Sequence, residues 1–537
     1  MATTNSTIRG LEDMLMHMLR RCHKTTYLRR IHALMEKLSL LQSNFLVTKM
    51  VDICDQNGEI EYARLLFERV INPNIFLYNA MLRAYTHSHL YILTINTYKK
   101  MLRSSAPQLQ EKIIPDRFTY PFVLRSCGGL LSVLLGKQVH GHVCKYGLIG
   151  NNIVVNLLLD MYVKCDGVAD ARKVFDEMPE RDAISWNSLI FGHMKLSQVK
   201  KARALFEAMP NKTIVSWTAM ISGYTKVGSF GDALDVFRRM QMAGVQPDWV
   251  TLVAVLPACA QLGALELGKW IHFYAERNGF IEKIRVCNAL IEMYTKCGSM
   301  NQALQIFDSM AERDVISWSS MVAGLAHNGR AHEAIAMFHE MQRAKIEPNE
   351  ITFVGVLSAC AHAGLLDEGL KYFDLMQKDY KVEPEIEHYG CMVDLLGRTG
   401  NISRAVEVIG GMEMEADSAI WGSVLSSCRS QRDLKTAVVA MERLLELEPE
   451  DTGNMVLLAN IYADLGEWEG VSRMRKLIRS KKMKKRRPGC SLIEVNGVVQ
   501  EFVSGDDPKA AAAEAVLVLL GVQMSTEFWT DDEFLDQ

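Results

Sequence analysis

The sequence predicts an all-α fold, a solenoid of stacked helix–turn–helix repeats. Three observations support this prediction. The chain has 537 residues, more than one compact hydrophobic core usually organises. Helix-forming residues dominate, and only 13 prolines interrupt them. Similar segments recur along the chain, which is the signature of a repeat array.

Composition excludes several other classes of protein. Hydrophobic residues make up 49% of the chain, yet no apolar run reaches the roughly 18 residues that span a bilayer, so we expect no membrane span. The 12 cysteines include no CxxC pair, which argues against a zinc knuckle or a disulfide scaffold and favours reduced thiols. We expect no metal and no cofactor. The net charge of -3 means that any nucleic-acid binding must rely on local surface or side-chain readout.

The N-terminal part is basic and has two interpretations. Residues 1–11 precede the first recognisable repeat. The first 40 residues carry the acidic side chains Glu12, Asp13 and Glu36 and the basic side chains Arg9, Arg20, Arg21, Lys24, Arg29, Arg30 and Lys37. An Arg-rich segment that is poor in acids is typical of organelle targeting. A degenerate first repeat explains the same residues equally well.

The repeat is clearest in three segments, 75–116, 214–248 and 315–349. Each has an apolar helical stripe, a glycine or short polar turn, and a second stripe with apolar residues at i, i+3 and i+4. Each then ends on Pro-Asp or Pro-Asn. Such a hairpin buries its apolar face only by stacking on its neighbours.

Unit length varies along the array. Residues 152–182 and 284–314 form 31-residue units, whereas 117–151 and 249–283 form 35-residue units. The longer units share a cysteine at the eleventh position and a histidine at the twenty-fourth, and the cysteine recurs in 350–385; these residues are Cys127, Cys259, Cys360, His140 and His272. Recurrence at fixed positions favours packing over metal binding or nucleophilic chemistry.

These motifs resemble the pentatricopeptide-repeat family of plants, in its subfamily of alternating ordinary, long and short repeats. The resemblance covers residues 12–503, with the repeat array at 12–417, and it implies a right-handed α-solenoid that reads single-stranded RNA at about one base per repeat. The repeats are 12–43, 44–74, 75–116, 117–151, 152–182, 183–213, 214–248, 249–283, 284–314, 315–349, 350–385 and 386–417. In 75–116 the segment SSAPQLQEKII lengthens the repeat, which we interpret as a surface-loop insertion.

Two positions in each repeat are candidates for base readout. The fourth position holds Trp186, Trp217 or Trp318, which we interpret as core residues. The fifth position is short and polar, namely Thr48, Asn79, Asn156, Asn187, Thr218, Asn288 and Ser319. The last position of the same repeats is also polar, namely Asn74, Asp116, Asp182, Thr213, Asp248, Asp314 and Asn349. Helix-start chemistry would explain the fifth position alone, but not its match at the repeat end.

The resemblance implies how these pairs read bases. An asparagine amide can donate and accept, so it matches a uracil edge, whereas a shorter hydroxyl leaves room for a purine. Apolar second positions such as Val215 and Ile316 can clamp the base faces. The family's pairing rules predict the core A-U-n-U-n-G-n-U-A from 5′ to 3′. The pairs of the long repeats (Pro121/Asn151, Val253/Lys283) and of the last two repeats (Val354/Glu385, Gly390/Asp417) are not interpreted.

Two further helical hairpins, 418–451 and 452–485, resemble the E motifs of plant RNA-editing factors. Residues 486–537 resemble the short extension after them, followed by an acidic tail. Alternating apolar residues around Asn496-Gly497 predict a β-hairpin. A basic run has two interpretations, as RNA phosphate contacts or as a solvated helix end; its residues include Lys481, Lys482, Lys484, Lys485, Arg486 and Arg487.

Editing enzymes of this family end in a zinc-dependent cytidine deaminase with H-x-E and C-x-x-C ligands. No histidine follows His388 here, so we expect the chain not to be an enzyme by itself. The resemblance implies an organellar C-to-U editing factor, mitochondrial or alternatively chloroplast. Its implied partners are single-stranded organellar RNA, a trans-acting DYW-type cytidine deaminase and multiple organellar RNA editing factor proteins. RNA binding for splicing or transcript stabilisation, and a protein-binding scaffold, are the alternatives.

Overall fold

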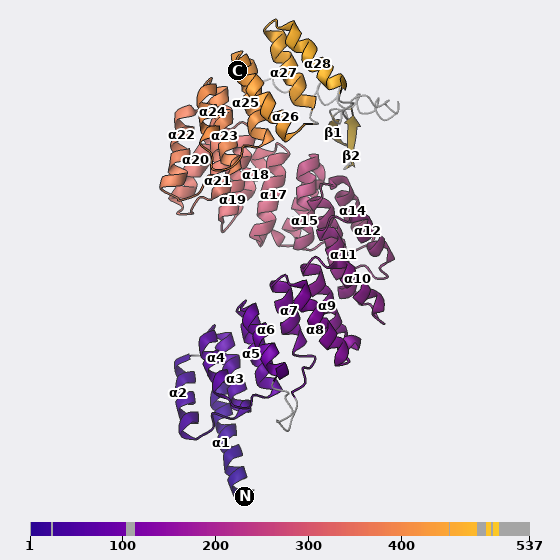
Figure 1. Cartoon of the computed structure of the whole chain (residues 1–537), viewed down its shortest axis with the longest axis vertical. Coiled ribbons are helices and arrows are strands. Elements are labelled where there is room, and N and C mark those ends of the chain that lie inside the picture. The colour runs from indigo at the N-terminus through magenta and orange to yellow at the C-terminus, as the bar shows by residue number, and fades with distance from the viewer. Residues whose placement is uncertain are drawn as a thin grey trace. The chain divides into compact units, whose positions relative to one another are not determined.

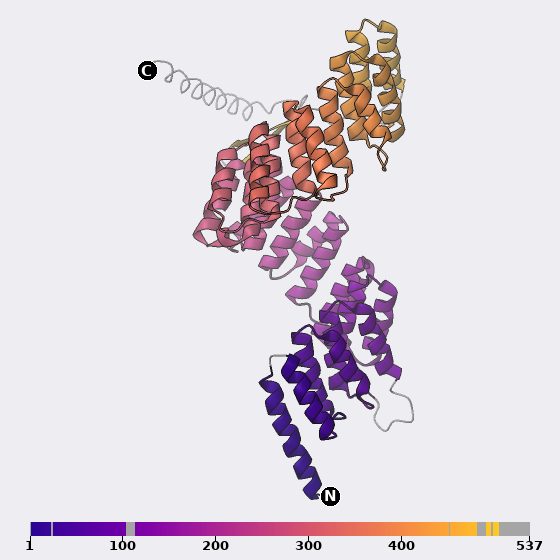
Figure 2. The ribbon, with the colours of Figure 1, turned by 90° about the vertical axis from the view of Figure 1, so that its left-hand side faces the viewer.

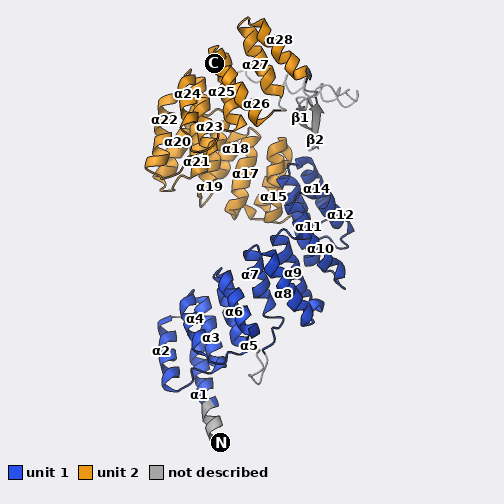
Figure 3. Cartoon of the chain, in the orientation of Figure 1, with its two compact units in different colours: residues 1–246 blue, residues 247–537 orange. Residues whose placement is uncertain are grey.

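The computed structural model describes residues 2–22, 25–103, 113–449, 452–480, 490–495 and 498–503. The chain divides into two compact units, residues 1–246 and 247–537 (Figure 3). Within each unit, successive helices form antiparallel hairpins, which can be followed in two views (Figures 1 and 2). The predicted all-α repeat array is therefore confirmed.

The first unit contains fourteen α-helices within its described ranges and a single turn of 3₁₀-helix after α8. They are α1 (Ala2–Arg20), α2 (Thr25–Lys37), α3 (Asn44–Gln56), α4 (Ile60–Arg69), α5 (Ile75–His87), α6 (Tyr91–Arg103), α7 (Tyr120–Gly129), α8 (Val133–Lys145), η1 (Leu148–Gly150), α9 (Asn152–Lys164), α10 (Val168–Glu177), α11 (Ala183–Lys195), α12 (Val199–Ala208), α13 (Ile214–Lys226) and α14 (Phe230–Met242).

The second unit continues the same alternation and ends with a pair of strands. Its elements are α15 (Trp249–Leu262), α16 (Leu265–Arg277), η2 (Phe280–Glu282), α17 (Ile284–Lys296), α18 (Met300–Ser309), α19 (Val315–His327), α20 (Ala331–Arg343), α21 (Glu350–Ala363), α22 (Leu366–Lys378), α23 (Ile386–Arg398), α24 (Ile402–Gly410), α25 (Ser418–Gln431), α26 (Leu434–Leu447), α27 (Thr452–Asp464), α28 (Trp468–Ser480), β1 (Cys490–Val495) and β2 (Val498–Val503).

The turn inside each repeat lies where the sequence places its glycine or polar residues. In 284–314, Gly298 adopts a φ of +76° between α17 and α18. The N–H of Ser299 then donates to the carbonyl of Tyr294 at 2.8 Å, which satisfies an otherwise unpaired helix-end carbonyl. Asp166 takes the same place in 152–182 with a φ of +58°, a left-handed conformation that aspartate tolerates better than most side chains.

First helices of consecutive repeats pack directly on one another within each unit. In the first unit α3, α5, α7, α9, α11 and α13 form such a series, and in the second unit α15, α17, α19, α21, α23, α25 and α27 do. The second helix of a repeat packs on its own first helix and commonly on the next one. Gly223 permits one close approach, since a β-carbon there would lie 2.5 Å from Cγ of Met194. Within each unit the first helices thus form a layer that can present one residue per repeat.

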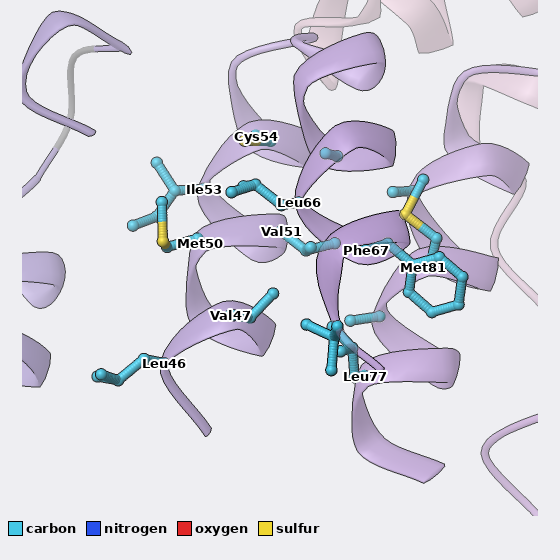
Figure 4. Packing of buried hydrophobic residues seen from close by; sticks show 14 of the residues in the cluster. Leu46, Val47, Met50, Val51, Ile53, Cys54, Leu66, Phe67, Leu77 and Met81 are labelled. Carbon is cyan, nitrogen blue, oxygen red and sulfur yellow. The ribbon is translucent and has the colours of Figure 1, made fainter. Parts of the chain in front are cut away.

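Buried apolar side chains fill the space between neighbouring hairpins. Figure 4 shows Phe67 of α4 close to Leu77 and Met81 of α5, in a cluster that continues toward α3. The fourth-position tryptophans belong to this packing, because Phe175–Trp186, Phe206–Trp217 and Phe307–Trp318 are edge-to-face pairs with ring centroids 4.8 Å apart. The interpretation as core residues is therefore confirmed for Trp217 and Trp318, whereas Trp186 makes the same ring contact but is only half-buried.

The recurrent cysteines and histidines also pack rather than cluster. Cys127, Cys259 and Cys360 are completely buried, and burial raises the pKa of Cys127 and of Cys360 to about 12, which makes these thiols inert. Nδ1 of His140 lies 3.0 Å from the hydroxyl of Tyr162, and His272 repeats this contact with Tyr294 at 3.0 Å. Among the described residues, no three His, Cys, Asp or Glu side chains are grouped so that they could hold a metal.

The first repeat begins within helix α1, and a pair of strands lies near the C-terminus. Helix α1 continues on both sides of residue 12, and its Leu15 and Leu19 are buried in one cluster with Leu28 and Ile31 of α2. Residues from 15 onward thus pack as a repeat. Near the C-terminus, β1 and β2 pair antiparallel, with Val495 opposite Val498, in the segment where the sequence predicts a hairpin. No helix in the described ranges has the length and apolarity to cross a bilayer.

Candidate nucleic-acid interface

In five of the predicted pairs, the fifth and last residues of a repeat are hydrogen-bonded to each other. In four pairs the amide Nδ2 of a fifth-position asparagine is the donor, and in the fifth pair the hydroxyl of Ser319 donates. The distances are 3.1 Å for Asn79–Asp116, 2.8 Å for Asn156–Asp182, 3.4 Å for Asn187–Thr213, 3.1 Å for Asn288–Asp314 and 3.2 Å for Ser319–Asn349. The pairing inferred from sequence position is therefore a physical contact.

The last residue of a repeat is commonly also the N-cap of the next helix, although α7 begins after Thr119 rather than directly after Asp116. Asp182 is the N-cap of α11, where its Oδ1 accepts from the N–H of Ser185 at 2.9 Å while its Oδ2 accepts from Asn156. Helix-start chemistry therefore belongs to the last position, whereas the fifth position lies inside the first helix. A single carboxylate both begins one helix and orients the amide of the helix before it.

Electrostatics keep these carboxylates ionised. Burial by itself would raise the pKa of Asp182, but hydrogen bonds from the N–H of Ser185 and the amide of Asn156 outweigh burial and lower it. The pKa of Asp314 is lowered in the same way, with burial opposed by Ser317 and Asn288. An ionised carboxylate only accepts hydrogen bonds, so the asparagine must turn its NH₂ group toward it.

The predicted pair of Thr48 and Asn74 behaves differently. Thr48 donates its hydroxyl to the carbonyl of Asn44 at 2.6 Å, and Asn74 accepts from the N–H of Leu77 at 3.0 Å as the N-cap of α5. Thr48 and Asn74 nevertheless line one cavity. Thr218 lies in α13 of the first unit, and Asp248 caps α15 in the second.

The cavity beside Thr48 and Asn74 has a volume of about 620 Å³. Phe45 and Phe76, the second-position residues of their repeats, line it with 57% and 69% of their surface exposed. Arg20 and Lys49 add positive charge to its lining, and the carboxylate of Asp52, which also lines it, is ion-paired with Arg83. Exposed aromatic rings, polar floor groups and cationic side chains together suit a flat, polar-edged, anionic ligand such as a nucleotide.

Second positions are apolar and exposed along most of the array. Val215 and Ile316 are 60% and 55% exposed, and they share this exposure with Ile153, Ile184, Val250 and Ile351. The repeat 284–314 departs from this pattern, because its second residue is the exposed Arg285. Apolar side chains left in solvent at one fixed repeat position indicate a surface that is covered in use.

The long repeats lack the polar pair. Their fifth residues are Pro121 and Val253, and their last residues are Asn151 and Lys283. Asn151 accepts from the N–H of Val154 at 3.2 Å, so it only caps α9. Lys283 precedes α17 without any side-chain cap.

The last repeat, 386–417, also lacks a pair. Gly390 at the fifth position leaves a hollow of about 430 Å³, which Asp417 lines while capping α25.

Sequence reasoning missed one set of residues at this interface. A hydroxyl at the third position of the following repeat reaches the fifth-position side chain in three repeats. These contacts are Thr119–Asn79 at 2.8 Å, Ser317–Asn288 at 2.7 Å and Thr352–Ser319 at 2.7 Å. The signal was present as Ser or Thr three residues after five of the terminal Asp and Asn residues, Asp116, Asp182, Asp248, Asp314 and Asn349, which is also the spacing of a capping box.

Comparison with known proteins assigns the family. The chain is 58% identical to Pentatricopeptide repeat-containing protein At2g20540 of Arabidopsis thaliana over 95% of both chains. It is 40% identical to Pentatricopeptide repeat-containing protein At5g56310 of the same plant, covering 93% of this chain and 94% of that protein. The chain belongs to the pentatricopeptide-repeat family.

Individual pentatricopeptide repeats are matched between residues 153 and 415. The PPR repeat family matches residues 212–261 and 313–362, and the PPR repeat matches 153–182, 184–214, 285–315, 351–380 and 387–415. The E motif matches residues 431–494, which places this pentatricopeptide-repeat protein in the E subgroup. The match overlaps the predicted hairpins, observed as α25–α26 and α27–α28.

The fold resembles that of a solved pentatricopeptide-repeat protein. The structure of PPR10 from maize aligns with a TM-score of 0.51 at 16% identity over 87% of this chain and 72% of that chain. The structure of PPR10 with an 18-nt psaJ RNA element aligns with a TM-score of 0.53 at 18% identity over 84% and 76%. At these identities the likeness establishes the helical-repeat fold. The basic run from Lys481 to Arg487 and the acidic tail lie outside the described residues.

Proposed function

We propose that this pentatricopeptide-repeat protein binds single-stranded RNA in a plant organelle, reads its sequence, and selects a cytidine for C-to-U editing. The observation that carries the proposal is the repeated polar pair, which is hydrogen-bonded in five repeats and flanked in four of them by an exposed apolar second position. The solved complex of PPR10 with an RNA element, which shares the fold, supports RNA as the ligand.

The chemistry of the interface suits single-stranded bases. The exposed second-position side chains cover the faces of a base, and stacking on aromatic groups such as Phe45 and Phe76 is worth about 1–3 kcal/mol per base. The polar pair then meets the base edge, where donors and acceptors distinguish one base from another. Because both groups recur once per repeat on the stacked first helices, one repeat serves one base.

The proposed register follows from the identities of the pairs. The asparagine–aspartate pairs at Asn79, Asn156 and Asn288 read U. Thr48 and Ser319, each with a terminal asparagine, read A, and Thr218 with Asp248 reads G. The proposed core is A-U-n-U-n-G-n-U-A, in which the long repeats contribute spacing. Six bases recur often by chance, so additional contacts must complete specificity.

The E motif supports editing as the purpose of this binding. We propose that it recruits a DYW-type cytidine deaminase in trans, together with multiple organellar RNA editing factor proteins. A deaminase needs His and Cys ligands for its zinc ion and a glutamate as proton shuttle, and within these 537 residues no histidine follows His388. We place the protein in the mitochondrion, with the chloroplast as the alternative.

A transcriptome-wide comparison of C-to-U sites tests this proposal. We expect plants without the protein to lose editing at one or a few organellar cytidines whose upstream bases fit the proposed core, and to regain it when the chain is restored. The purified chain alone should not deaminate such an RNA. Unchanged editing combined with a splicing or transcript-abundance defect would reject the editing role and favour RNA maturation instead.

A further inference from the structure

The hydrogen bonds of the four fifth-position asparagines differ at the amide oxygen. In 284–314, Nδ2 of Asn288 donates to Oδ1 of Asp314 at 3.1 Å, and Oδ1 of Asn288 accepts from the hydroxyl of Ser317 at 2.7 Å. In 75–116, Asn79 has the same two partners in Asp116 at 3.1 Å and Thr119 at 2.8 Å. Both ends of these two amides are therefore engaged.

The hydroxyl hydrogen of Ser317 points at the amide oxygen of Asn288 rather than at Asp314. Oδ1 of Asp314 also lies 2.9 Å from the Ser317 hydroxyl, but it already accepts from the N–H of Ser317 at 2.9 Å and from Asn288. Two donors occupy the two lone pairs of one oxygen. The oxygen of Asn288 is both nearer and less occupied, so the serine hydrogen goes there.

The other two asparagines lack this contact. The amide oxygens of Asn156 and Asn187 are buried without a hydrogen-bond partner. The serine that could serve Asn156 is Ser185, whose hydroxyl donates instead to the backbone carbonyl of Asp182 at 2.7 Å. Asn187 is held only by the Thr213 hydroxyl at 3.4 Å, and a hydroxyl can face either end of an amide.

This difference matters for reading a pyrimidine. Uracil carries a carbonyl oxygen at C4, where cytosine carries an amino group. An asparagine amide that directs a hydrogen at that position therefore favours uracil, whereas one that directs its oxygen there favours cytosine. A buried amide oxygen without a donor is unfavourable, which weakens the preference for the hydrogen-directing orientation. A hydroxyl that donates a hydrogen bond to the amide oxygen removes this free-energy cost.

We infer that the third residue of the following repeat, through its hydroxyl, is a positioning residue for base reading. Thr119 holds the amide oxygen of Asn79 inward, and Ser317 does the same for Asn288. The remaining Nδ2 hydrogen of each asparagine then meets the base, so uracil is preferred over cytosine. The inference rests on the proposed RNA binding. It orders the repeats, with the strongest U-over-C preference at 75–116 and 284–314, a weaker one at 152–182, and the weakest at 183–213.

Equilibrium binding of the full-length chain tests the inference. The probe is a single-stranded RNA carrying the proposed core, compared with the same RNA in which the U opposite 284–314 is C. Ser317→Ala should lower the ratio of the two affinities about two- to tenfold, the value of one hydrogen bond. Ser317→Thr should keep the wild-type ratio, since threonine retains the hydroxyl.

Ser185→Ala is the matched control, because it removes a serine at the same repeat position whose hydroxyl does not reach the asparagine. Its U-over-C ratio, measured at the base opposite 152–182, should stay within about twofold of wild type. Using two RNAs on one protein sample cancels any loss of folded protein. An unchanged ratio in Ser317→Ala, or an equal fall in Ser185→Ala, would overturn the inference. A wild-type chain that distinguishes no base at either position would instead refute the proposed RNA reading.

Discussion

The long repeat 249–283 and the short repeat 284–314 are neighbours in the second unit and pack by the same scheme. Their first helices, α15 and α17, contact each other, and each buries an apolar face against the layer of first helices. At the fifth and last positions, the long repeat has Val253 and Lys283 where the short repeat has Asn288 and Asp314. Packing and base reading thus depend on different residues of one hairpin.

The long repeat uses its additional residues for a different contact. After α16 it makes the 3₁₀ turn η2, and His272 reaches Tyr294 of the following repeat with Nδ1 3.0 Å from the hydroxyl. The short repeat has neither feature and instead ends on a carboxylate that caps α19. The comparison indicates that long repeats secure the stacking of their neighbours, whereas the polar pairs occur in short and ordinary repeats, although the short repeat 386–417 lacks one.

The largest expected effect on base preference comes from replacing the fifth and last residues of the short repeat with those of the long repeat. The double variant Asn288→Val, Asp314→Lys should lose its preference for U at the matching base, a loss of about 1–3 kcal/mol by analogy with base-edge contacts in DNA. Affinities for four RNAs that differ only at that base would measure it.

The same variant also removes the cap of α19, which costs about 1 kcal/mol of stability. Asp417→Lys is the control, because Asp417 caps α25 through the N–H of Ile420 at 2.9 Å in a repeat whose fifth residue is Gly390. It should lose similar stability and keep the preference for U. An equal loss of base preference in the control would show that capping, rather than reading, was disturbed.

A smaller effect, on stability rather than on base preference, is expected from a substitution in the long repeat. His272→Phe removes the hydrogen bond to Tyr294 and should lower the free energy of unfolding by about 1 kcal/mol, with base preferences unchanged. Chemical denaturation and the four-RNA comparison would measure the two properties separately. A changed base preference would contradict the division of roles between the repeat types.

This variant also has a pH signature. Burial lowers the pKa of His272 from its usual value of 6.5, so the unfolded chain binds the proton more readily than the folded one. Wild-type stability should therefore fall as the pH drops below about 6.5, and His272→Phe should lack this component.

Much of the interface could be predicted from the sequence because it repeats. Position within a repeat fixes where a residue lies on the first helix, so Asn288 and Asp314 could be paired across 26 residues from the repeat pattern alone. Repetition likewise identified Trp318 as a core residue and the cysteines as packing residues.

What repetition could not predict is the direction of a side chain. Ser185 and Ser317 occupy the same repeat position, yet one hydroxyl donates to a backbone carbonyl and the other to an asparagine. This choice depends on which acceptors nearby already have their donors, and no residue pattern records it. The terminal carboxylate's second role as helix cap was missed for a similar reason, because its cap partners are backbone groups.

The central claim is that the fifth residue of a repeat reads a base. It is tested most directly by Asn288→Thr with Asp314 unchanged, measured as the affinity of the full-length chain for two RNAs that carry U or G opposite 284–314. The account predicts that the preference moves from U toward G, while preferences at the other repeats stay as in wild type. An unchanged preference for U in a folded variant would contradict it.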